Sequence, residues 1–474
     1  MPEHIKTDLC IIGAGSAGLS VAAGAAQMGA RTVLIERGLM GGDCLNFGCV
    51  PSKSLLAAAK AAAAWRHSAA FGIDAAPSQV DWPRVRAHVA GVIAAIAPHD
   101  SVERFEGLGV RVIKAEARFT GPDTLIAGEA TLRARRFVIA TGSEPLVPPI
   151  PGLDQVSFLT NETVFGIEAA PQHLLVLGGG PIGCELAQAH RRLGAEVTVI
   201  EMSRILPKDD EDASSIVRES LIGDGVRVIQ GGKAVAVERT DKGIIVEVER
   251  NGSNERLSGS HLLIAVGRRP SVAGLNLEAA GVAVDKSGIR LDERLRTTNR
   301  RIYAAGDVSG GPQFTHMAGH EAGIVLRNAL FRLPAKVERR AVPWVTYTDP
   351  ELAQVGLTEA AARGKGEDVV CLRSDYGESD RARAERAGDG FVKVIATRRG
   401  AVLGATIVGR NAGELILPWV LAMQHRLGLR AMASVIAPYP TLGEIGKRAA
   451  GNFYAPRLFS AGTRRLVRLL QRLP

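Results

Sequence analysis

The sequence lacks several features that define other classes of protein. Its 474 residues include only five cysteines, and its start, MPEHIKTDLCIIGAG, has no basic segment followed by an apolar run and a cleavage site. We therefore expect neither a disulfide-stapled secreted protein nor a secretory leader, and we place the chain in the cytoplasm. No uncharged apolar run approaches the ~20 residues of a membrane-spanning helix, because the Ala-rich stretch at 55–64 is short and contains Lys60.

Aromatic residues are also scarce, at 4% of the chain. The formal net charge of +9 could indicate nucleic-acid binding. However, the basic residues are scattered, and too few aromatic residues accompany them to form platforms on which bases stack. We therefore expect anionic small molecules, and no nucleic acid, as ligands.

The densest basic segment lies at the C-terminus, where arginines alternate with apolar residues. The arginines are Arg457, Arg464, Arg465, Arg468 and Arg472. This pattern could form a helix that lies on a membrane surface. A terminal helix that docks its apolar stripe on the rest of the protein and keeps its arginines in water is the simpler interpretation, and we favour it.

The sequence does contain an internal repeat. Residues 11–36 (IIGAGSAGLSVAAGAAQMGARTVLIE) and residues 176–201 (VLGGGPIGCELAQAHRRLGAEVTVIE) align without a gap. In each copy an apolar run typical of a buried strand meets a Gly-x-Gly-x-x-Gly turn, and a helix rich in alanine and leucine follows. The turn glycines are Gly13, Gly15 and Gly18 in the first copy and Gly178, Gly180 and Gly183 in the second.

A second strand in each copy ends in an acid, Glu36 or Glu201, 23 residues after the first glycine. The glycines permit a tight turn and close approach to a pyrophosphate at the helix N-terminus, while the acid accepts hydrogen bonds from a ribose. One such turn is weak evidence, but two complete units predict two dinucleotide sites, most simply for FAD and a nicotinamide nucleotide. Glu201 favours NADH over NADPH because an acid repels a 2′-phosphate, although Arg204 could accommodate that phosphate.

The rest of the chain predicts an α/β fold with two Rossmann-like dinucleotide-binding domains and a separate C-terminal α+β domain. Apolar runs at 137–142 and 262–267 close the two units, and the proline-rich residues 148–151 mark a boundary between them. After residue 340 the dinucleotide pattern stops, and strands are expected at 391–396 and 401–408. We assign an FAD-binding domain to 1–150 and 270–340, an NAD(P)-binding domain to 151–269 and the last domain to 341–474.

The stretch GGDCLNFGCVPSK at 41–53 holds two of the five cysteines, Cys44 and Cys49. A structural metal site would need a second pair of Cys or His ligands at compact spacing, which the sequence lacks, so we expect no metal. Burial as small apolar side chains is the other alternative, and it is our default for Cys10, Cys184 and Cys371. Residues 49–52, however, look like the first turn of a helix with proline near its start, where a thiolate is stabilised. A redox role therefore suits the pair.

Seven segments carry a family resemblance. They are GAGSAG (13–18), GGDCLNFGCVPSK (41–53), ATG (140–142), GGGPIGCE (178–185), GRRP (267–270), YAAGD (303–307) and VTYTDPELAQVGLTEAAA (345–362). They resemble the FAD-dependent pyridine nucleotide-disulfide oxidoreductases, the group that includes dihydrolipoamide dehydrogenase, glutathione reductase and mercuric reductase. The likeness runs from about residue 8 to about residue 450 and implies a homodimer joined through the C-terminal domain.

The resemblance also implies roles for particular residues. Cys44 would exchange with substrate, Cys49 would face the flavin, and Lys53 would lie near the flavin and pair with Glu185. Positions implied to hold the cofactors are Gly42, Thr141, Gly142, Gly267 and Asp307. NADH would then reduce the flavin, the reduced flavin would open a Cys44–Cys49 disulfide, and Cys44 would attack an external acceptor, with net flow possible in either direction.

The sequence departs from the family at one position. Disulfide reductases and dihydrolipoamide dehydrogenases resemble each other in a C-terminal His-Pro-Thr-x-x-Glu, whereas this chain has Tyr439 in place of the histidine and retains the acid as Glu444. A phenol with a pKa of ~10 is a poor base at neutral pH, and imidazole with a pKa of ~6.5 is well matched to thiol exchange. Mercuric reductases also lack this histidine, but the adjacent C-terminal cysteines of that group are missing here.

Three functions follow as hypotheses. The first is a dihydrolipoamide-dehydrogenase-like enzyme that acts on a disulfide or dithiol, and we favour it. The second resembles mercuric reductase and passes electrons to a soft metal ion held between Cys44 and Cys49. The third is a redox sensor or a diaphorase with no dedicated small disulfide substrate.

Overall fold

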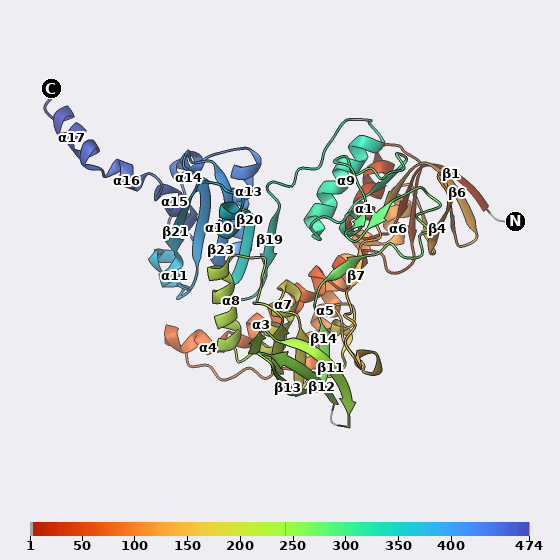
Figure 1. The fold of residues 1–474 in the computed structure, drawn as a ribbon, viewed down its shortest axis with the longest axis horizontal. Helices are drawn as coiled ribbons and strands as arrows, with labels where there is room; N and C mark the ends of the chain where they lie inside the picture. The colour runs from red at the N-terminus through yellow and green to blue at the C-terminus, as the bar shows by residue number, and fades with distance from the viewer. Residues whose placement is uncertain (1–2, 242, 474) are drawn as a thin grey trace. The chain divides into compact units, whose positions relative to one another are not determined.

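The computed structural model describes residues 3–241 and 243–473, and these form two compact units. One unit holds the residues up to 178 together with 192–197 and 233–338. The other holds 179–191, 198–232 and the residues from 339 onward. Figure 1 labels many of the helices and strands.

The first unit contains a seven-stranded sheet whose main path runs β3-β2-β1-β6-β5-β4, with β18 paired to β6. The neighbours β3-β2-β1-β6-β18 are all parallel, while β4, β5 and β6 form an antiparallel meander. The strands are β1 (Glu3–Ile12), β2 (Thr32–Glu36), β3 (Val110–Lys114), β4 (Ala117–Gly121), β5 (Thr124–Ala127), β6 (Ala130–Ile139) and β18 (Ile302–Ala304).

Both faces of this sheet are covered, as expected for parallel strands that read as continuous apolar runs. Leu9 and Ile11 of β1 pack with α1 (Ser16–Gln27) and α9 (Thr315–Ala329), which lie together on one face (Figure 1). Cys10 and Ile12 alternate to the opposite face and join a second buried cluster. The first dinucleotide unit is therefore built as the sequence predicted.

The second dinucleotide unit has a four-stranded sheet in the order β10-β9-β8-β14. Its strands β8 and β9 end at Leu177 and Glu201, as the repeat predicted. A three-stranded antiparallel sheet, β11-β12-β13, is inserted between β10 and β14 in the chain. The bounds are β8 (His173–Leu177), β9 (Glu196–Glu201), β10 (Arg227–Gln230), β14 (His261–Ile264), β11 (Lys233–Thr240), β12 (Gly243–Arg250) and β13 (Ser253–Gly259).

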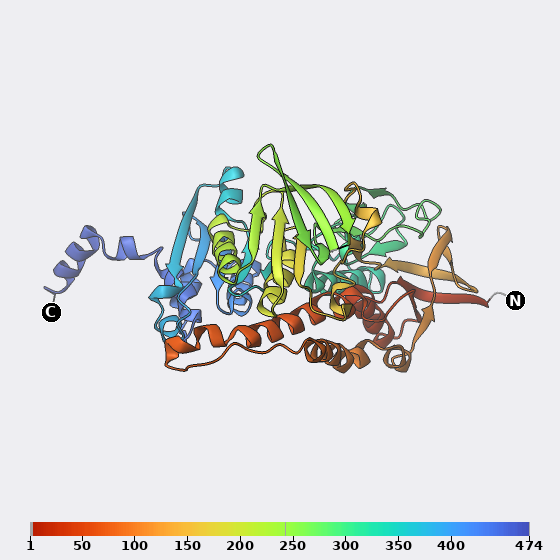
Figure 2. The same ribbon diagram turned by 90° about the horizontal axis from the view of Figure 1, so that it is seen from below.

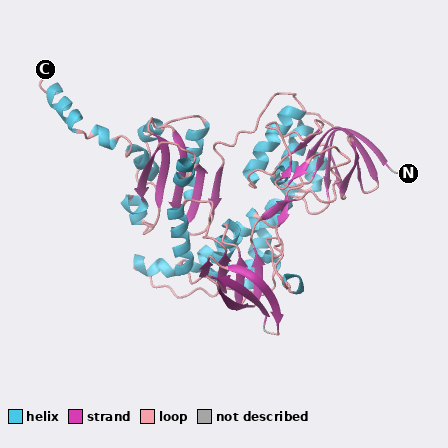
Figure 3. Cartoon of the chain, in the orientation of Figure 1, coloured by secondary structure: helices cyan, strands magenta, loops and turns pink. Residues whose placement is uncertain are grey.

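The C-terminal part is α+β, with the antiparallel sheet β19-β20-β23-β22-β21 and helices on its faces (Figure 3). Its core gathers around the fully buried side chain of Trp419. The predicted strands at 391–396 and 401–408 are present as β22 and β23. The elements are β19 (Pro343–Thr346), β20 (Glu351–Gly356), β21 (Val369–Asp375), β22 (Phe391–Thr397), β23 (Val402–Gly409), α12 (Ala412–Leu415), α13 (Leu417–Gln424) and α15 (Gly443–Gly451).

The remaining elements are further helices, of which α2, α3 and α7 carry expected site residues, and four short strands. The helices are α2 (Gly42–Asn46), α3 (Cys49–Ala63), α4 (Trp65–Ser68), α5 (Trp82–Ile96), α6 (Val102–Gly107), α7 (Pro181–Arg192), α8 (Glu211–Gly223), α10 (Glu359–Gly364), α11 (Asp380–Ala384) and α14 (Leu429–Ser434). The short strands are β7 (Ser143–Pro145), β15 (Arg268–Pro270), β16 (Val284–Asp285) and β17 (Gly288–Ile289).

The chain closes with two helices, α16 (Ala455–Leu458) and α17 (Ala461–Leu470). The arginine-rich helix predicted here does form, but neither helix contains a buried residue. The expectation that its apolar stripe docks on this chain was therefore wrong for the described residues. Among these residues, no helix combines the length and apolar character needed to cross a bilayer.

Candidate active site

The first glycine turn leads from β1 into α1. Gly13 has φ +103°, and a Cβ on it would lie 2.3 Å from the carbonyl oxygen of Ala140. A Cβ on Gly18 would lie 1.8 Å from the oxygen of Gly13, so both positions require glycine for packing. A Cβ on Gly15 would meet only the Cα of Gly42, at 3.9 Å. Gly15 thus faces open space at the helix N-terminus, where a pyrophosphate fits.

The second turn repeats this arrangement. Gly178 has φ +108°, and its Cβ would lie 2.4 Å from the oxygen of Ala265, the counterpart of Ala140 at the end of β14. A Cβ on Gly180 would meet nothing within 4 Å. The next residue, Pro181, opens α7, and Gly183 is buried in its first turn. This turn also presents an open helix N-terminus.

The two glutamates hold their turns in the same way. Glu36 Oε2 accepts a hydrogen bond from Ala14 N at 2.6 Å, and its Oε1 accepts one from Gly38 N at 2.6 Å. Glu201 accepts from Gly179 N at 2.7 Å and from Ser203 N at 2.9 Å. Glu201 also accepts from Ser203 Oγ at 3.0 Å. A carboxylate has about four acceptor positions, so each glutamate keeps at least one acceptor for a ribose hydroxyl. The repeat predicted from the sequence is thus reproduced at the level of individual hydrogen bonds.

The cysteine segment lies against the first turn. Cys44 is on α2, and Cys49 is the first residue of α3, so the predicted helix start is confirmed. Figure 2 shows α3 in orange-red as one long helix. Gly42 has φ +58°, and a Cβ there would lie 2.6 Å from Gly15 Cα. Glycine at 42 therefore lets the helix that carries Cys44 touch the dinucleotide turn.

The two cysteines are present as thiols and differ in exposure. Cys44 is half-buried, and its hydrogen bond with Cys49, together with burial, raises the pKa of its thiol. Cys49 is exposed, and its Sγ lies 3.6 Å from the Oγ1 of Thr315, the first residue of α9. The pair therefore has one thiol held inward and one held at a helix N-terminus beside a hydroxyl.

A nearly buried arginine links this segment to the loop of Asp307. Arg268, with 11% of its side chain exposed, lies 3.2 Å from Asp43 Oδ1. It also donates to Ser143 Oγ at 2.7 Å and to Asn161 Oδ1 at 3.0 Å. Ser143 in turn donates to Asp307 Oδ2 at 2.6 Å. A continuous polar path thus connects Asp307 to the residue that precedes Cys44.

The comparisons with known proteins decide the family. The model for the pyridine nucleotide-disulphide oxidoreductase domain matches residues 7–322, and the model for the dimerisation domain of the same family matches 342–450. The chain belongs to the pyridine nucleotide-disulphide oxidoreductase family. It is accordingly an FAD-dependent enzyme that uses a nicotinamide nucleotide, and the dimerisation domain supports a homodimer.

Relatives come from more than one branch of the family. A mercuric reductase from Staphylococcus aureus is 37% identical over 449 residues, which cover 94% of this chain and 82% of the relative. A dihydrolipoyl dehydrogenase from Thermus scotoductus is 37% identical over 92% of this chain and 95% of its own length. The solved structure of the HOCl-induced flavoprotein disulfide reductase RclA from Escherichia coli, as a Cu(II) complex, covers 93% of this chain and 99% of its own, at 28% identity and a TM-score of 0.84.

Other residues expected to hold the family's cofactors lie around the loop of Asp307. Thr141 donates through its hydroxyl to Ser271 O at 2.6 Å, and Gly142 and Gly267 have φ of +69° and +130°. Burial raises the pKa of Asp307, and the hydrogen bond from Ser143 opposes that shift. The buried Glu321 of α9 accepts from Gly306 N at 2.9 Å and so holds the residue next to Asp307.

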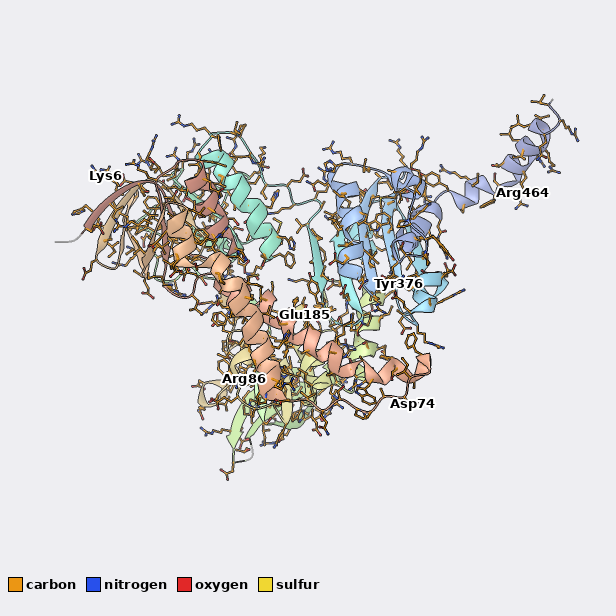
Figure 4. All side chains as sticks on the ribbon, turned by 180° about the vertical axis from the view of Figure 1, so that it is seen from behind. Lys6, Asp74, Arg86, Glu185, Tyr376 and Arg464 are labelled. Atoms are coloured by element: carbon orange, nitrogen blue, oxygen red, sulfur yellow. The ribbon has the colours of Figure 1, made fainter. Side chains whose placement is uncertain are left out.

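The expected lysine and glutamate lie on different helices. Lys53 is half-buried on α3, and Glu185 is 4% exposed on α7 (labelled in Figure 4). Glu185 Oε1 accepts a hydrogen bond from Tyr347 N at 2.9 Å. The pairing of Lys53 with Glu185 stays a prediction.

The position that departs from the family is exposed in this chain. Tyr439 is 71% exposed and donates to Asp380 Oδ2 at 3.2 Å, which raises the pKa of its phenol. Glu444 lies in the first turn of α15, and its Oε2 accepts from Thr441 N at 3.4 Å. Tyr439 is thus a protonated hydrogen-bond donor at neutral pH.

Sequence reasoning missed several residues of this site. Arg268 could have been predicted, because it lies within the GRRP segment. Asn161, Asp380 and Glu321 belong to no recognised motif, so nothing in the sequence indicated them. One expectation was also wrong: Cys10 and Cys184 are buried, but Cys371 on β21 is exposed.

Proposed function

We propose that the enzyme transfers electrons from NADH through FAD and the Cys44–Cys49 pair to a disulfide, or in the reverse direction from a dithiol, as dihydrolipoamide dehydrogenase does. The observation that carries the proposal is the position of the pair. The two thiols interact with each other, and the helix that carries Cys44 touches the first dinucleotide turn through Gly42. The dihydrolipoyl dehydrogenases among its relatives support the same substrate class.

In this mechanism FAD, when bound, supplies the two-electron relay between the nicotinamide and the cysteine pair. Cys44, as thiolate, attacks one sulfur of the substrate disulfide, which forms a mixed disulfide and releases one substrate thiolate. Cys49 then attacks Cys44 Sγ, which restores the Cys44–Cys49 disulfide and releases the second substrate sulfur. Two electrons from the nicotinamide reopen that disulfide, and the two released sulfurs take up two protons.

The chain's own residues prepare these steps. The N-terminus of α3 stabilises negative charge on Cys49, and Thr315 places a hydroxyl beside it. Gly13, Gly15, Gly18, Glu36, Thr141, Gly142 and Asp307 would hold FAD. We place this FAD-binding domain at 1–150 and 270–340, the NAD(P)-binding domain at 151–269 and the dimerisation domain at 341–474.

We further propose that NADH is preferred over NADPH. Glu201 holds a negative charge at the ribose position of the second turn. Arg204, which could have balanced a 2′-phosphate, is turned into its own loop. Its two terminal nitrogens donate hydrogen bonds of 2.7–3.1 Å to the backbone oxygens of Leu206, Pro207 and Asp209 and to Ser214 Oγ. The guanidinium of Arg204 is therefore not directed at the position of a 2′-phosphate.

The nucleotide preference is tested with Glu201→Gln, which keeps an acceptor for Gly179 N but removes the charge. Discrimination against NADPH, measured as the ratio of kcat/KM values, should fall by about tenfold. The exposed Glu249→Gln serves as the matched control and should leave the ratio unchanged. An unchanged ratio in Glu201→Gln would show that this charge does not select the nucleotide.

Reduction of a soft metal ion is the second candidate. Two interacting thiols suit such an ion, and Tyr439 offers no base for thiol exchange. The mercuric reductases among its relatives also favour it.

Steady-state NADH oxidation with lipoamide, glutathione disulfide and Hg(II) separates these candidates. Turnover with lipoamide that is lost in Cys44→Ser and kept in Cys371→Ser supports the dithiol enzyme. Turnover with Hg(II) alone supports the metal reductase. Slow turnover with all three, unaffected by Cys44→Ser, contradicts both and favours a diaphorase or redox sensor.

A further inference from the structure

The last helix, α17, is an unusual surface element. It begins after Ser460, whose Oγ accepts a hydrogen bond from Thr463 N at 3.2 Å, and runs to Leu470 without a buried residue. Four large aliphatic side chains are exposed in its ten residues, at 45–61% of their area. They are Leu466, Val467, Leu469 and Leu470. Single exposed apolar residues are ordinary, but four on one short helix are not.

The apolar and basic side chains of α17 lie on separate faces. At 3.6 residues per turn, Arg464, Arg465 and Arg468 fall within an arc of about 100°, and the four aliphatic residues occupy an arc of about 160° on the other side. Arg464, Arg465 and Arg468 are all exposed, and Arg464 is labelled on this helix in Figure 4. The helix is therefore amphipathic, and its apolar face has no cover within the described chain.

The charge of this segment is of one sign. After Glu444 the sequence contains no acidic residue, whereas it contains seven basic ones. They are Lys447, Arg448, Arg457, Arg464, Arg465, Arg468 and Arg472. In the described part of the chain, the arginines of α17 form no ion pair, while Arg448 is paired with Glu378 at 3.7 Å. The cations of α17 are thus presented together with its apolar face.

The segment lies outside the residues that match the family's domain models. The dimerisation-domain model ends its match at residue 450, before α16 and α17 begin. The catalytic cysteines and both dinucleotide turns lie elsewhere in the chain. A role for α17 is therefore separate from electron transfer.

We propose that α17 binds an anionic lipid surface, with its aliphatic face in the headgroup–acyl boundary and its arginines at the lipid phosphates. Such a surface matches both faces, because it offers negative charge and an apolar layer side by side, which is the environment that short basic amphipathic helices occupy. The helix does not span the bilayer, and attachment is reversible. A homodimer carries two copies of α17, which strengthens attachment when both engage the same surface.

The full-length FAD-loaded enzyme is sedimented with vesicles of phosphatidylglycerol and phosphatidylcholine in equal parts, and with vesicles of phosphatidylcholine alone. We expect binding to the anionic vesicles only, weakened at high salt because the arginine contacts are screened. Two variants separate the two faces. Leu466→Asp with Leu469→Asp, and Arg465→Glu with Arg468→Glu, should each lower the bound fraction by about tenfold or more.

Matched controls are the exposed Ile222→Asp on α8 and the exposed Arg250→Glu on β12, which should bind as the unchanged protein does. All variants should retain their flavin absorbance and NADH oxidation, which shows that they are folded. Absence of vesicle binding, or equal binding to both lipids, overturns the proposal. If the Leu466→Asp, Leu469→Asp variant instead changes the oligomeric mass, α17 belongs to a contact between copies of the chain, and the proposal is equally overturned.

Discussion

Replacement of Tyr439 by histidine should create a faster disulfide oxidoreductase. The Tyr439 hydroxyl donates to Asp380 at 3.2 Å, which raises the pKa of a phenol that is ordinarily near ~10. At pH ~7.5 less than about 1% of such a phenol is ionised, whereas about 90% of an imidazole with an ordinary pKa of ~6.5 is the neutral base. The substitution therefore supplies a base where almost none exists.

The size of the effect follows from the surroundings of the position. Positioned general acid–base catalysis contributes ~10²–10⁴-fold, and an imidazole placed without further adjustment should reach the lower part of that range. We expect kcat/KM for lipoamide to rise about 10- to 100-fold. Asp380 and Glu444 are acidic neighbours and should raise the imidazole pKa, so the gain should grow as pH increases through that pKa and the base form appears.

The assay is NADH-dependent lipoamide reduction over neutral to mildly alkaline pH. Reduction of the bound flavin by NADH serves as an internal control and should not change, because Tyr439 lies outside both dinucleotide turns. Tyr439→Phe is the matched variant, since it removes the hydroxyl without adding a base. Equal lipoamide activity in Tyr439→His and Tyr439→Phe at every pH would refute the reasoning that proton handling at this position limits thiol exchange.

Three further predictions concern the framework of the enzyme. Gly42→Ala should lower the flavin content of the purified protein, read from its absorbance, because the new Cβ would lie 2.6 Å from the first glycine turn at a φ of +58°; full flavin content would contradict this contact. Arg268→Met should lower the free energy of unfolding in urea by about 1–2 kcal/mol, because Ser143 and Asn161 lose a nearly buried donor, whereas Asp43 is 39% exposed and can be solvated. Lys393→Met should cost about 3 kcal/mol of unfolding free energy in urea, because Asp210 is 6% exposed and loses its amine at 2.9 Å. Adding Asp210→Asn to Lys393→Met should recover part of that loss, because the buried charge is then removed as well. If the two substitutions lower the unfolding free energy additively, the Lys393–Asp210 ion pair does not contribute to stability.

The gapless repeat of residues 11–36 and 176–201 was sufficient to predict both dinucleotide units, and the structure reproduces it to single hydrogen bonds at Glu36 and Glu201. The helix start at Cys49 and the C-terminal strands β22 and β23 were also predicted correctly. These features depend on local patterns, such as apolar periodicity, glycine conformation and proline in a first helical turn.

Two expectations failed because they concerned burial rather than secondary structure. Cys371 lies on the strand β21 and is exposed, although its residue type is usually buried. The terminal helix formed as predicted, but its apolar face did not dock on the chain. Amphipathicity shows that a face requires cover and does not say what provides it.

The sequence by itself determined the two nucleotide turns, the cysteine pair at 44 and 49 and the family, because each is encoded by residues close together in the chain. Only the tertiary structure decided that Arg268 links Asp43 to Ser143 and Asn161, and that Asp380 meets Tyr439. The members of these groups are separated by 59 to 225 positions, as between Asp380 and Tyr439 or between Asp43 and Arg268. Contacts at such separations depend on how the strands assemble into sheets, which local residue patterns do not encode.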